Sequence, residues 1–183
     1  MKSKTKVKPK AKVQVRAKAK VKPKAKTKPK ASAKPKPIPE GYHTATPYLI
    51  VQGAAQALDF YKSAFNAVET MRMPAPGGKV GHAEIRIGNS PIMLADEHPE
   101  MGYVGPQALG GTPVSLMLYV EDADAVFAKA TAQGASVVKP MQNQFYGDRS
   151  GTVKDPFGHV WTVATHIEDL TPEEIQKRMP SGC

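Results

Sequence analysis

Three polar side chains that could line a reactive site alternate along one short stretch of the sequence. His82, Glu84 and Arg86 occupy every second position, and small or apolar residues occupy the positions between them. Successive side chains of a strand point to opposite faces, so the pattern predicts a strand with one apolar and one polar face. On the polar face, His82 could act as a general base that Glu84 orients. A pair of charges on a solvated sheet gives the same pattern, and both interpretations stay open.

This strand is the first half of a predicted β-hairpin over residues 81–96. Gly88 and Asn89 both tolerate a positive φ, and we expect them to form the turn. Met93, in the second strand, falls on the same face as His82 and Glu84. The hairpin is therefore expected to form one wall of a binding cleft.

The hairpin ends a pattern of elements that occurs twice in the chain. A strand at 46–51, a helix from about 54 to 65 and a strand at 68–73 precede it, and the second set has a strand at 113–120, a helix at 122–134 and strands at 136–141, 150–154 and 160–166. Gly88 and Gly158, which occupy corresponding turns, are 70 residues apart. The repeat predicts an α+β fold of two βαβββ modules, at about 43–96 and 112–167, whose curved mixed sheets pair around a shared cleft.

The first 37 residues differ from the rest in composition. They hold 16 of the 26 basic residues and none of the 16 acidic ones, so residues 38–183 carry a net charge of −6. Lysine alternates with Ala, Val and Pro, which leaves little to bury and predicts a disordered basic tail. We expect a tail and linker at 1–40, a folded domain at 41–170, and a short helix with the C-terminus at 171–183.

The charge of the tail predicts a class of partner. Lysine clusters bind nucleic acid or another polyanion without sequence preference, and we expect residues 2–36 to do so. A solubilising extension is the alternative. The lone Cys183 and the absence of an apolar run of membrane-spanning length predict a cytoplasmic protein that contacts no membrane and associates with nucleic acid only through the tail.

Several stretches make the chain similar to a known superfamily. They are TPYLIV at 46–51, ALDFYKSAF at 57–65, GHAE at 81–84, GDRSG at 147–151 and DPFGHVW at 155–161. These stretches resemble the vicinal-oxygen-chelate superfamily, which contains glyoxalases, bleomycin resistance proteins and extradiol dioxygenases, and within it the PhnB-like branch. The tail resembles the Lys/Ala/Pro-rich tails of linker-histone-like proteins in composition. The superfamily resemblance implies a homodimer that binds a small organic ligand.

The same resemblance bears on a metal site. In the glyoxalase branch, His or Glu side chains from the first and last strand of each module hold a divalent ion. In this chain those positions are taken by Thr46, Met93, Ser115 and Thr162. None of them is a good ligand for an ion that prefers imidazole and carboxylate, so we expect no metal cofactor.

The cleft residues are predicted from the faces of the strands and from the resemblance. Besides His82 and Glu84 as catalytic candidates, we expect the ligand to contact Thr46, Tyr48, Arg86, Met93, Ser115, Met117, Tyr119, Arg149 and Thr162. Arg149 could bind an anionic ligand, or it could pair with a neighbouring carboxylate such as Asp148, Asp155 or Glu84.

Three functions remain open on the sequence. The first is a small-molecule-binding protein of the bleomycin-resistance kind without the glyoxalase metal ligands. The second is a metal-dependent lyase, isomerase or dioxygenase whose divalent ion is held at a displaced site around His82 and Glu84, with His166 as an additional candidate ligand. The third is an interaction protein that its basic tail tethers to a polyanion.

Overall fold

The structure is a computed structural model that describes residues 35–180. The chain divides into two compact units, Met1–Pro35 and Lys36–Cys183. The predicted disordered tail lies outside the described residues. Within residues 35–180, no helix is long and apolar enough to cross a membrane.

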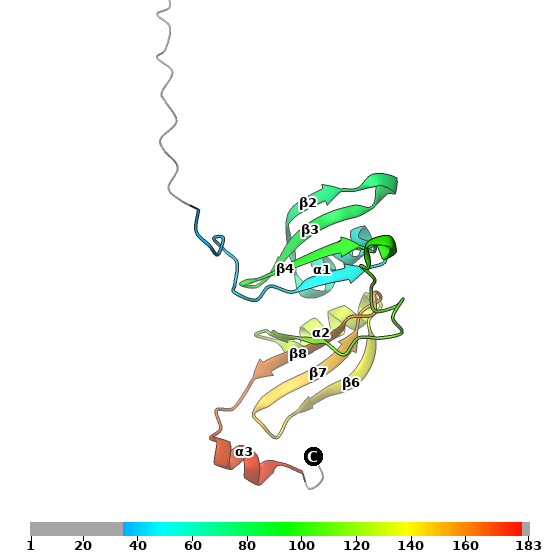
Figure 1. Ribbon diagram of the computed structural model, residues 1–183. Coiled ribbons are helices and arrows are strands. Elements are labelled where there is room, and N and C mark those ends of the chain that lie inside the picture. Colours follow the sequence, from blue (N-terminus) through cyan, green and yellow to red (C-terminus); the bar gives the residue numbers. More distant parts are fainter. Residues whose placement is uncertain (1–34, 181–183) are drawn as a thin grey trace, which may run out of the picture. The chain divides into compact units, whose positions relative to one another are not determined.

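The second unit begins with a module of one helix on a four-stranded sheet (Figure 1). Its elements are β1 (Tyr48–Val51), α1 (Ala54–Phe65), β2 (Val68–Pro74), β3 (Val80–Ile87) and β4 (Ser90–Asp96). The strand order is β1-β4-β3-β2, with β1 parallel to β4 and the other neighbours antiparallel. The hairpin predicted at 81–96 is thus the β3–β4 pair.

A second module repeats the first. It contains β5 (Ser115–Tyr119), α2 (Ala123–Ala132), β6 (Ser136–Asn143), β7 (Asp148–Lys154) and β8 (Val160–His166) in the sheet order β5-β8-β7-β6, and α3 (Pro172–Arg178) follows it. Only β5 and β8 pair in parallel. The predicted α+β fold of two βαβββ modules is confirmed, and each observed strand lies within two residues of its predicted bounds.

Local signals set the ends of the helices. Asn66 adopts a left-handed φ of 54° and ends α1, as its residue type predicts. Asp122 caps α2 by accepting a hydrogen bond from the Ala125 amide at 2.9 Å. Thr171 and Glu174 form the capping box that their spacing predicts at the start of α3.

Each sheet buries one face under helices and leaves the other face uncovered by any helix of the described chain. In β3 the buried side chains are Val80, Ala83, Ile85 and Ile87, all of which belong to the apolar core, and β3 contacts α1. The two modules also share one core, since α1 contacts α2 and the Phe65 ring lies 4.8 Å from that of Trp161, centroid to centroid. We call the uncovered faces the first and second open faces. No strand pairing joins the two sheets, and cavities lined by residues of both modules lie where the modules meet.

Candidate functional site

A chain of four polar side chains lies on the first open face. The Tyr48 Oη atom of β1 is 3.1 Å from Nδ1 of His82 on β3. The His82 Nε2 atom is 3.2 Å from Oε1 of Glu84, two residues further along the same strand. The hydroxyl of Tyr42, in the segment before β1, donates to Oε2 of Glu84. The structure therefore joins the two predicted catalytic candidates to each other and to two tyrosines.

Strand register accounts for this placement. Glu84 lies opposite Met93 of β4 and Met71 of β2, and Met93 lies opposite Tyr48 of β1. Side chains that lie opposite one another in a sheet share a face. The side chain of Glu84 consequently belongs to the face that α1 does not cover.

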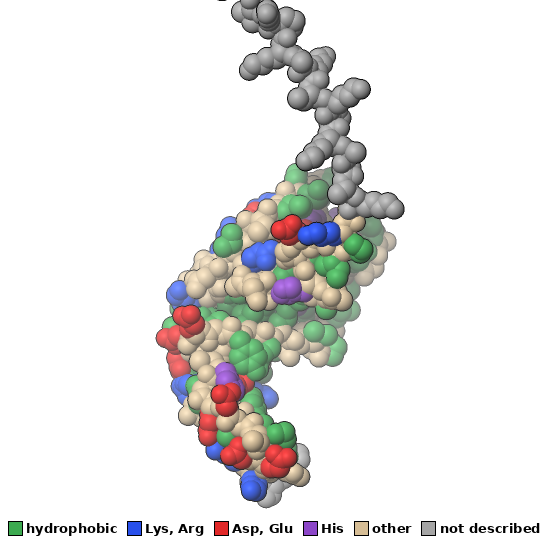
Figure 2. Space-filling model, turned by 90° about the vertical axis from the view of Figure 1, so that its left-hand side faces the viewer, with side chains coloured by type: hydrophobic (Ala, Val, Ile, Leu, Met, Phe, Trp, Pro, Cys, Tyr) green, Lys and Arg blue, Asp and Glu red, His purple; other side chains and the backbone are tan. Residues whose placement is uncertain are grey.

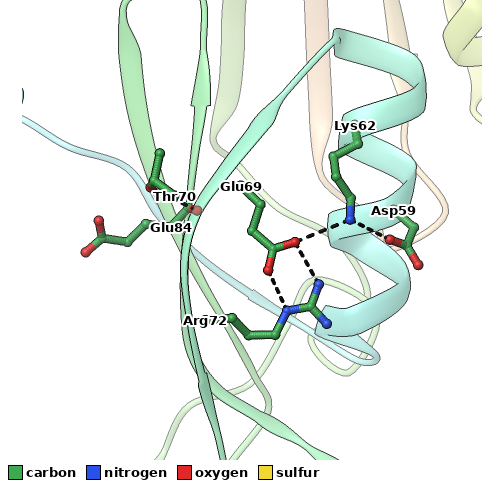
Figure 3. A network of polar contacts seen from close by, with 6 residues as sticks. All are labelled: Asp59, Lys62, Glu69, Thr70, Arg72 and Glu84. Carbon is green, nitrogen blue, oxygen red and sulfur yellow. Dashed lines mark hydrogen bonds and ion pairs between the residues drawn. The ribbon is translucent and has the colours of Figure 1, made fainter. Parts of the chain in front are cut away.

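The opposite face of β2 carries a different network. Glu69 accepts from Arg72 at 2.7 Å and from Lys62 of α1 at 3.3 Å, and Lys62 also pairs with Asp59 at 2.8 Å. Figure 3 shows this network between β2 and α1, with the carboxylate of Glu84 pointing away from it. The charges of β2 and α1 are thus paired with each other and do not enter the first open face.

Apolar side chains surround the polar chain on the first open face. Tyr48 is 48% exposed and Met73, which lies opposite His82, is 54% exposed. Met71 is also exposed, and Met93 is half-buried. Figure 2 shows histidine side chains lying beside hydrophobic ones on the face of the second unit that is turned to the viewer. Exposed methionine and tyrosine next to hydrogen-bonding groups are typical of sites for small organic molecules.

Hydrogen bonding and burial determine the charge states of the polar side chains on the first open face. The hydrogen bond from Tyr42 lowers the pKa of Glu84, and the contact with His82 lowers it further. Glu84 is therefore a carboxylate at neutral pH. The same hydrogen bond raises the pKa of Tyr42, while burial, followed by the nearby Tyr103, raises the pKa of Tyr48. Both phenols are neutral at that pH.

A second polar cluster lies on the second open face. The Tyr119 hydroxyl donates to Oδ2 of Asp148 at 2.8 Å, and His166 Nδ1 lies 2.8 Å from Oδ1 of the same residue. His166 Nε2 lies 3.1 Å from Oδ1 of Asp169. Asp148, and then Asp169, raise the pKa of His166. The sequence places His166 on the polar face but does not reveal that the buried Asp148 is its partner.

The remaining predicted residues distribute over both modules. Arg86 lies on the first open face, and its guanidinium donates to the carbonyl oxygens of Gly41 and Asn89, at 3.2 Å each. On the second open face, Ser115 and Met117 follow one another in alternate positions of β5, and Met117 lies opposite Thr162 of β8. Thr162 shares a 3.0 Å hydrogen bond with Thr152.

Arg149 pairs with a carboxylate of α2. Its side chain lies on the helix-covered face of the second sheet, where Nε and Nη2 donate to the two carboxylate oxygens of Asp124 on α2, at 2.5 and 2.6 Å. Nη1 donates to Asn143. Arg149 thus pairs with a carboxylate, as the sequence allows, but the partner is Asp124 and not Asp148, Asp155 or Glu84.

Two cavities bring predicted residues of the two modules together. One of about 980 Å³ is lined by Thr46 and Tyr48 beside Ser115 and Met117. The other, of about 1200 Å³, is lined by Arg86, Met117, Tyr119 and His166, among others. The polar residue that strand patterning misses is Tyr42, because it lies outside any strand.

The residues present do not fit the metal centre of the glyoxalase branch. Thr46, Met93, Ser115 and Thr162, which the family resemblance places at its four ligand positions, carry neither an imidazole nor a carboxylate. Among residues 35–180, no group of three or more His, Cys, Asp or Glu side chains is arranged to hold a metal ion. His166, the additional candidate ligand of the displaced site, lies on the second sheet, where its ring nitrogens face Asp148 and Asp169.

Comparison with known proteins agrees with this architecture. The sequence profile of the Glyoxalase/Bleomycin resistance protein/Dioxygenase superfamily matches residues 42–163. Protein Rv0887c of Mycobacterium tuberculosis is 45% identical over 139 residues, which cover 74% of this chain and 82% of that protein.

Solved structures with the same fold include TioX from Micromonospora sp. ML1 and the PhnB protein from Bacillus cereus. TioX is 27% identical with a TM-score of 0.54, and the match covers 70% of this chain and all of that one. The PhnB protein is 22% identical with a TM-score of 0.55, and the match covers 67% of this chain and 99% of the PhnB chain. This similarity concerns the fold alone.

Proposed function

Since the chain belongs to the glyoxalase/bleomycin resistance protein/dioxygenase superfamily, we propose that it binds a small organic molecule on the first open face, without the metal of the glyoxalase branch. The observation that supports this proposal is the hydrogen-bonded chain from Tyr48 to Tyr42, bordered by exposed methionines. Its polar groups would orient a ligand, and the methionine side chains would adapt to the ligand's apolar part.

A binding measurement with two methionine variants tests the location of the site. Met73→Glu places a charge on the first open face, whereas Met101→Glu alters a methionine that is also exposed, at 67%, but lies in the 3₁₀ segment Pro99–Met101. A panel of planar organic molecules is screened by the rise in melting temperature, since a ligand stabilises the folded state to which it binds. We expect Met73→Glu alone to abolish the rise. Equal loss in both variants, or in neither, would contradict the proposed site.

Elemental analysis of the purified protein separates the proposal from the metal-dependent alternative. We expect no stoichiometric divalent metal in a truncated protein of residues 36–183, the compact second unit. One tightly bound ion per chain would refute the metal-free proposal. If His82→Ala then released that ion, a displaced metal site for lyase, isomerase or dioxygenase chemistry would be supported.

We also propose that two copies associate. Met117 and Tyr119 are exposed on the second open face, and such apolar surface is commonly buried in an interface. Light scattering should give twice the mass of one chain, and Met117→Glu should shift the population towards the monomer. A wild-type protein that is monomeric at high concentration would rule out the dimer.

Polyanion binding is a second candidate activity, favoured by the charge of residues 2–36. All of the chain's net positive charge comes from this segment, because residues 38–183 are net negative. Binding through lysine contacts to phosphates weakens steeply with salt. The full chain should therefore bind duplex DNA with a strong salt dependence, and residues 36–183 should not. Equal binding by both proteins would exclude the tail as the binding segment.

A further inference from the structure

The hydrogen bonds on the first open face have a defined direction. Glu84 is a carboxylate, so it can only accept, and the His82 nitrogen beside it, Nε2, must carry a hydrogen. In a neutral imidazole the other nitrogen is then an acceptor. Nδ1 of His82 therefore accepts from the Tyr48 hydroxyl, and the order of donation is Tyr48 to His82 to Glu84.

We infer that Tyr48, His82 and Glu84 form a proton relay that binds a weakly acidic aromatic molecule, such as a phenol or an enol, as its anion. This inference rests on the proposed function, because it concerns the same face. The ligand's hydroxyl proton passes to Tyr48 Oη, and the proton that Tyr48 held passes to His82 Nδ1. Two O–H bonds break, and one O–H and one N–H bond form. The result is a ligand anion that accepts from Tyr48, and an imidazolium next to Glu84.

The surroundings of His82 favour this product. In the product the charged His82 ring would donate from Nε2 to Oε1 of Glu84, 3.2 Å away, and from Nδ1 to Tyr48 Oη, 3.1 Å away, so both of its N–H groups would have an acceptor. Glu84 is held in place from its other oxygen by Tyr42. Two other ionisable groups lie near these hydrogen-bonded side chains. Tyr103 raises the pKa of Tyr48, and the guanidinium of Arg86 donates hydrogen bonds to backbone carbonyl oxygens. His82 is thus the group placed to gain a positive charge against the ligand.

The chemical class of the ligand follows from the same geometry. A neutral molecule without an acidic hydrogen has no proton for the relay. A carboxylic acid is already ionised at neutral pH and would need an additional proton from solvent. A phenol or enol brings the proton that the relay accepts. An aromatic ring also suits the methionines around Tyr48, because thioethers make favourable contacts with rings.

The second open face supplies an internal control. Tyr119 is also an exposed tyrosine, but it donates directly to the Asp148 carboxylate. Both ring nitrogens of His166 face carboxylates, so the charged ring donates from both and then has no nitrogen left to take up a ligand proton. This cluster contains the same three kinds of side chain, and it cannot relay a ligand proton.

The experiment uses 4-nitrophenol as the probe, because its phenol and phenolate absorb at different wavelengths, and 4-nitroanisole as a neutral analogue in which a methyl group replaces the acidic hydrogen. Binding is measured at a pH at which free 4-nitrophenol is mainly protonated. We expect bound 4-nitrophenol to show the phenolate spectrum and to bind at least about tenfold more tightly than 4-nitroanisole, as one charged hydrogen bond would provide. Tyr48→Phe and His82→Gln should each remove that preference and the phenolate band, whereas Met101→Glu, in the 3₁₀ segment outside the first open face, should retain both.

The outcomes separate the relay from the proposed binding site. If both probes bind equally and the bound phenol stays protonated, the relay is wrong and the binding site stands. If neither probe binds, both proposals fail. A nitrogen-15 NMR measurement of the free protein tests the relay without a ligand, since Nδ1 of His82 should carry no hydrogen. A hydrogen on Nδ1 in the neutral ring would overturn the relay whatever the probes do.

Discussion

Replacing Asp155 by asparagine should weaken the fold strongly, because this carboxylate joins both modules. Asp155 is 3% exposed and follows β7. Its Oδ1 accepts from the backbone amides of Phe157 and His159 at 2.9 Å each. Its Oδ2 accepts from the Tyr61 hydroxyl of α1 at 2.9 Å and from the Trp161 indole of β8 at 2.8 Å. Four donors thus converge on one buried side chain.

The magnitude follows from the acceptors that Asp155→Asn removes. An amide has one accepting oxygen, and its NH2 group can only donate, so two of the four donors lose their acceptor. Tyr61 and Trp161 are fully buried and cannot turn to water instead. A hydrogen bond to a charged group contributes about 1.5–3 kcal/mol, which predicts a loss of about 3–6 kcal/mol in the free energy of unfolding. The melting temperature should fall by about 6 °C or more.

Urea unfolding followed by tryptophan fluorescence measures this loss, since Trp161 is the single tryptophan of the chain. Tyr61→Phe is the matched control because it removes one donor and keeps the carboxylate, and we expect it to cost about 1.5–3 kcal/mol. In the Asp155→Asn background the same change should cost less, because the two residues are coupled. An Asp155→Asn protein within about 1 kcal/mol of the wild type would refute the reasoning, since a buried acceptor cannot be lost at so small a cost.

Three further predictions concern the second module and the C-terminal helix. Asp148 raises the pKa of His166, so the protonated ring stabilises the fold at a pH below the ordinary imidazole pKa of 6.5. This contribution is lost as pH rises through the raised pKa, and His166→Gln should abolish the corresponding decrease in the free energy of unfolding. An unchanged pH profile in the variant would contradict the prediction. Gly151→Ala should lower the free energy of unfolding by about 1–3 kcal/mol, because the added Cβ would lie 2.7 Å from the Phe127 ring. An unaltered melting temperature would exclude this clash. Thr171→Ala removes an N-cap that contributes about 1 kcal/mol, and it should speed amide hydrogen exchange in α3 about fivefold. The melting temperature should not change, since α3 buries none of its residues. Slower or equal exchange would contradict the role of the cap.

The strand patterns predicted much of the fold and the first open face. Alternation along residues 81–87 separates His82 and Glu84 from Ala83 and Ile85, and the structure has the same division. Alternation is a property of the backbone itself, because successive Cβ atoms of any strand point to opposite sides. The helix ends at Asn66 and Asp122 were predictable for the same reason, since caps act within a few residues of the sequence.

Arg149 shows where such patterns stop being informative. Its neighbour Asp148 faces the second open face, so Arg149 faces the helices, beside Gly151 and Val153. Which carboxylate it reaches there depends on how α2 packs against β7, and that brought Asp124 within 2.6 Å from 25 residues away. Packing between elements is not encoded in the alternation of either one.

By itself the sequence determined the repeated βαβββ order, the helix caps and the face on which His82 and Glu84 lie. Only the tertiary structure decided their partners. Tyr42 reaches Glu84 from a segment without strand or helix, and Tyr48 reaches His82 through a parallel pairing of β1 with β4. Local geometry sets the direction of a side chain, whereas contacts between residues more than 30 positions apart depend on the packing of whole elements. The relay on the first open face is built from both kinds of information.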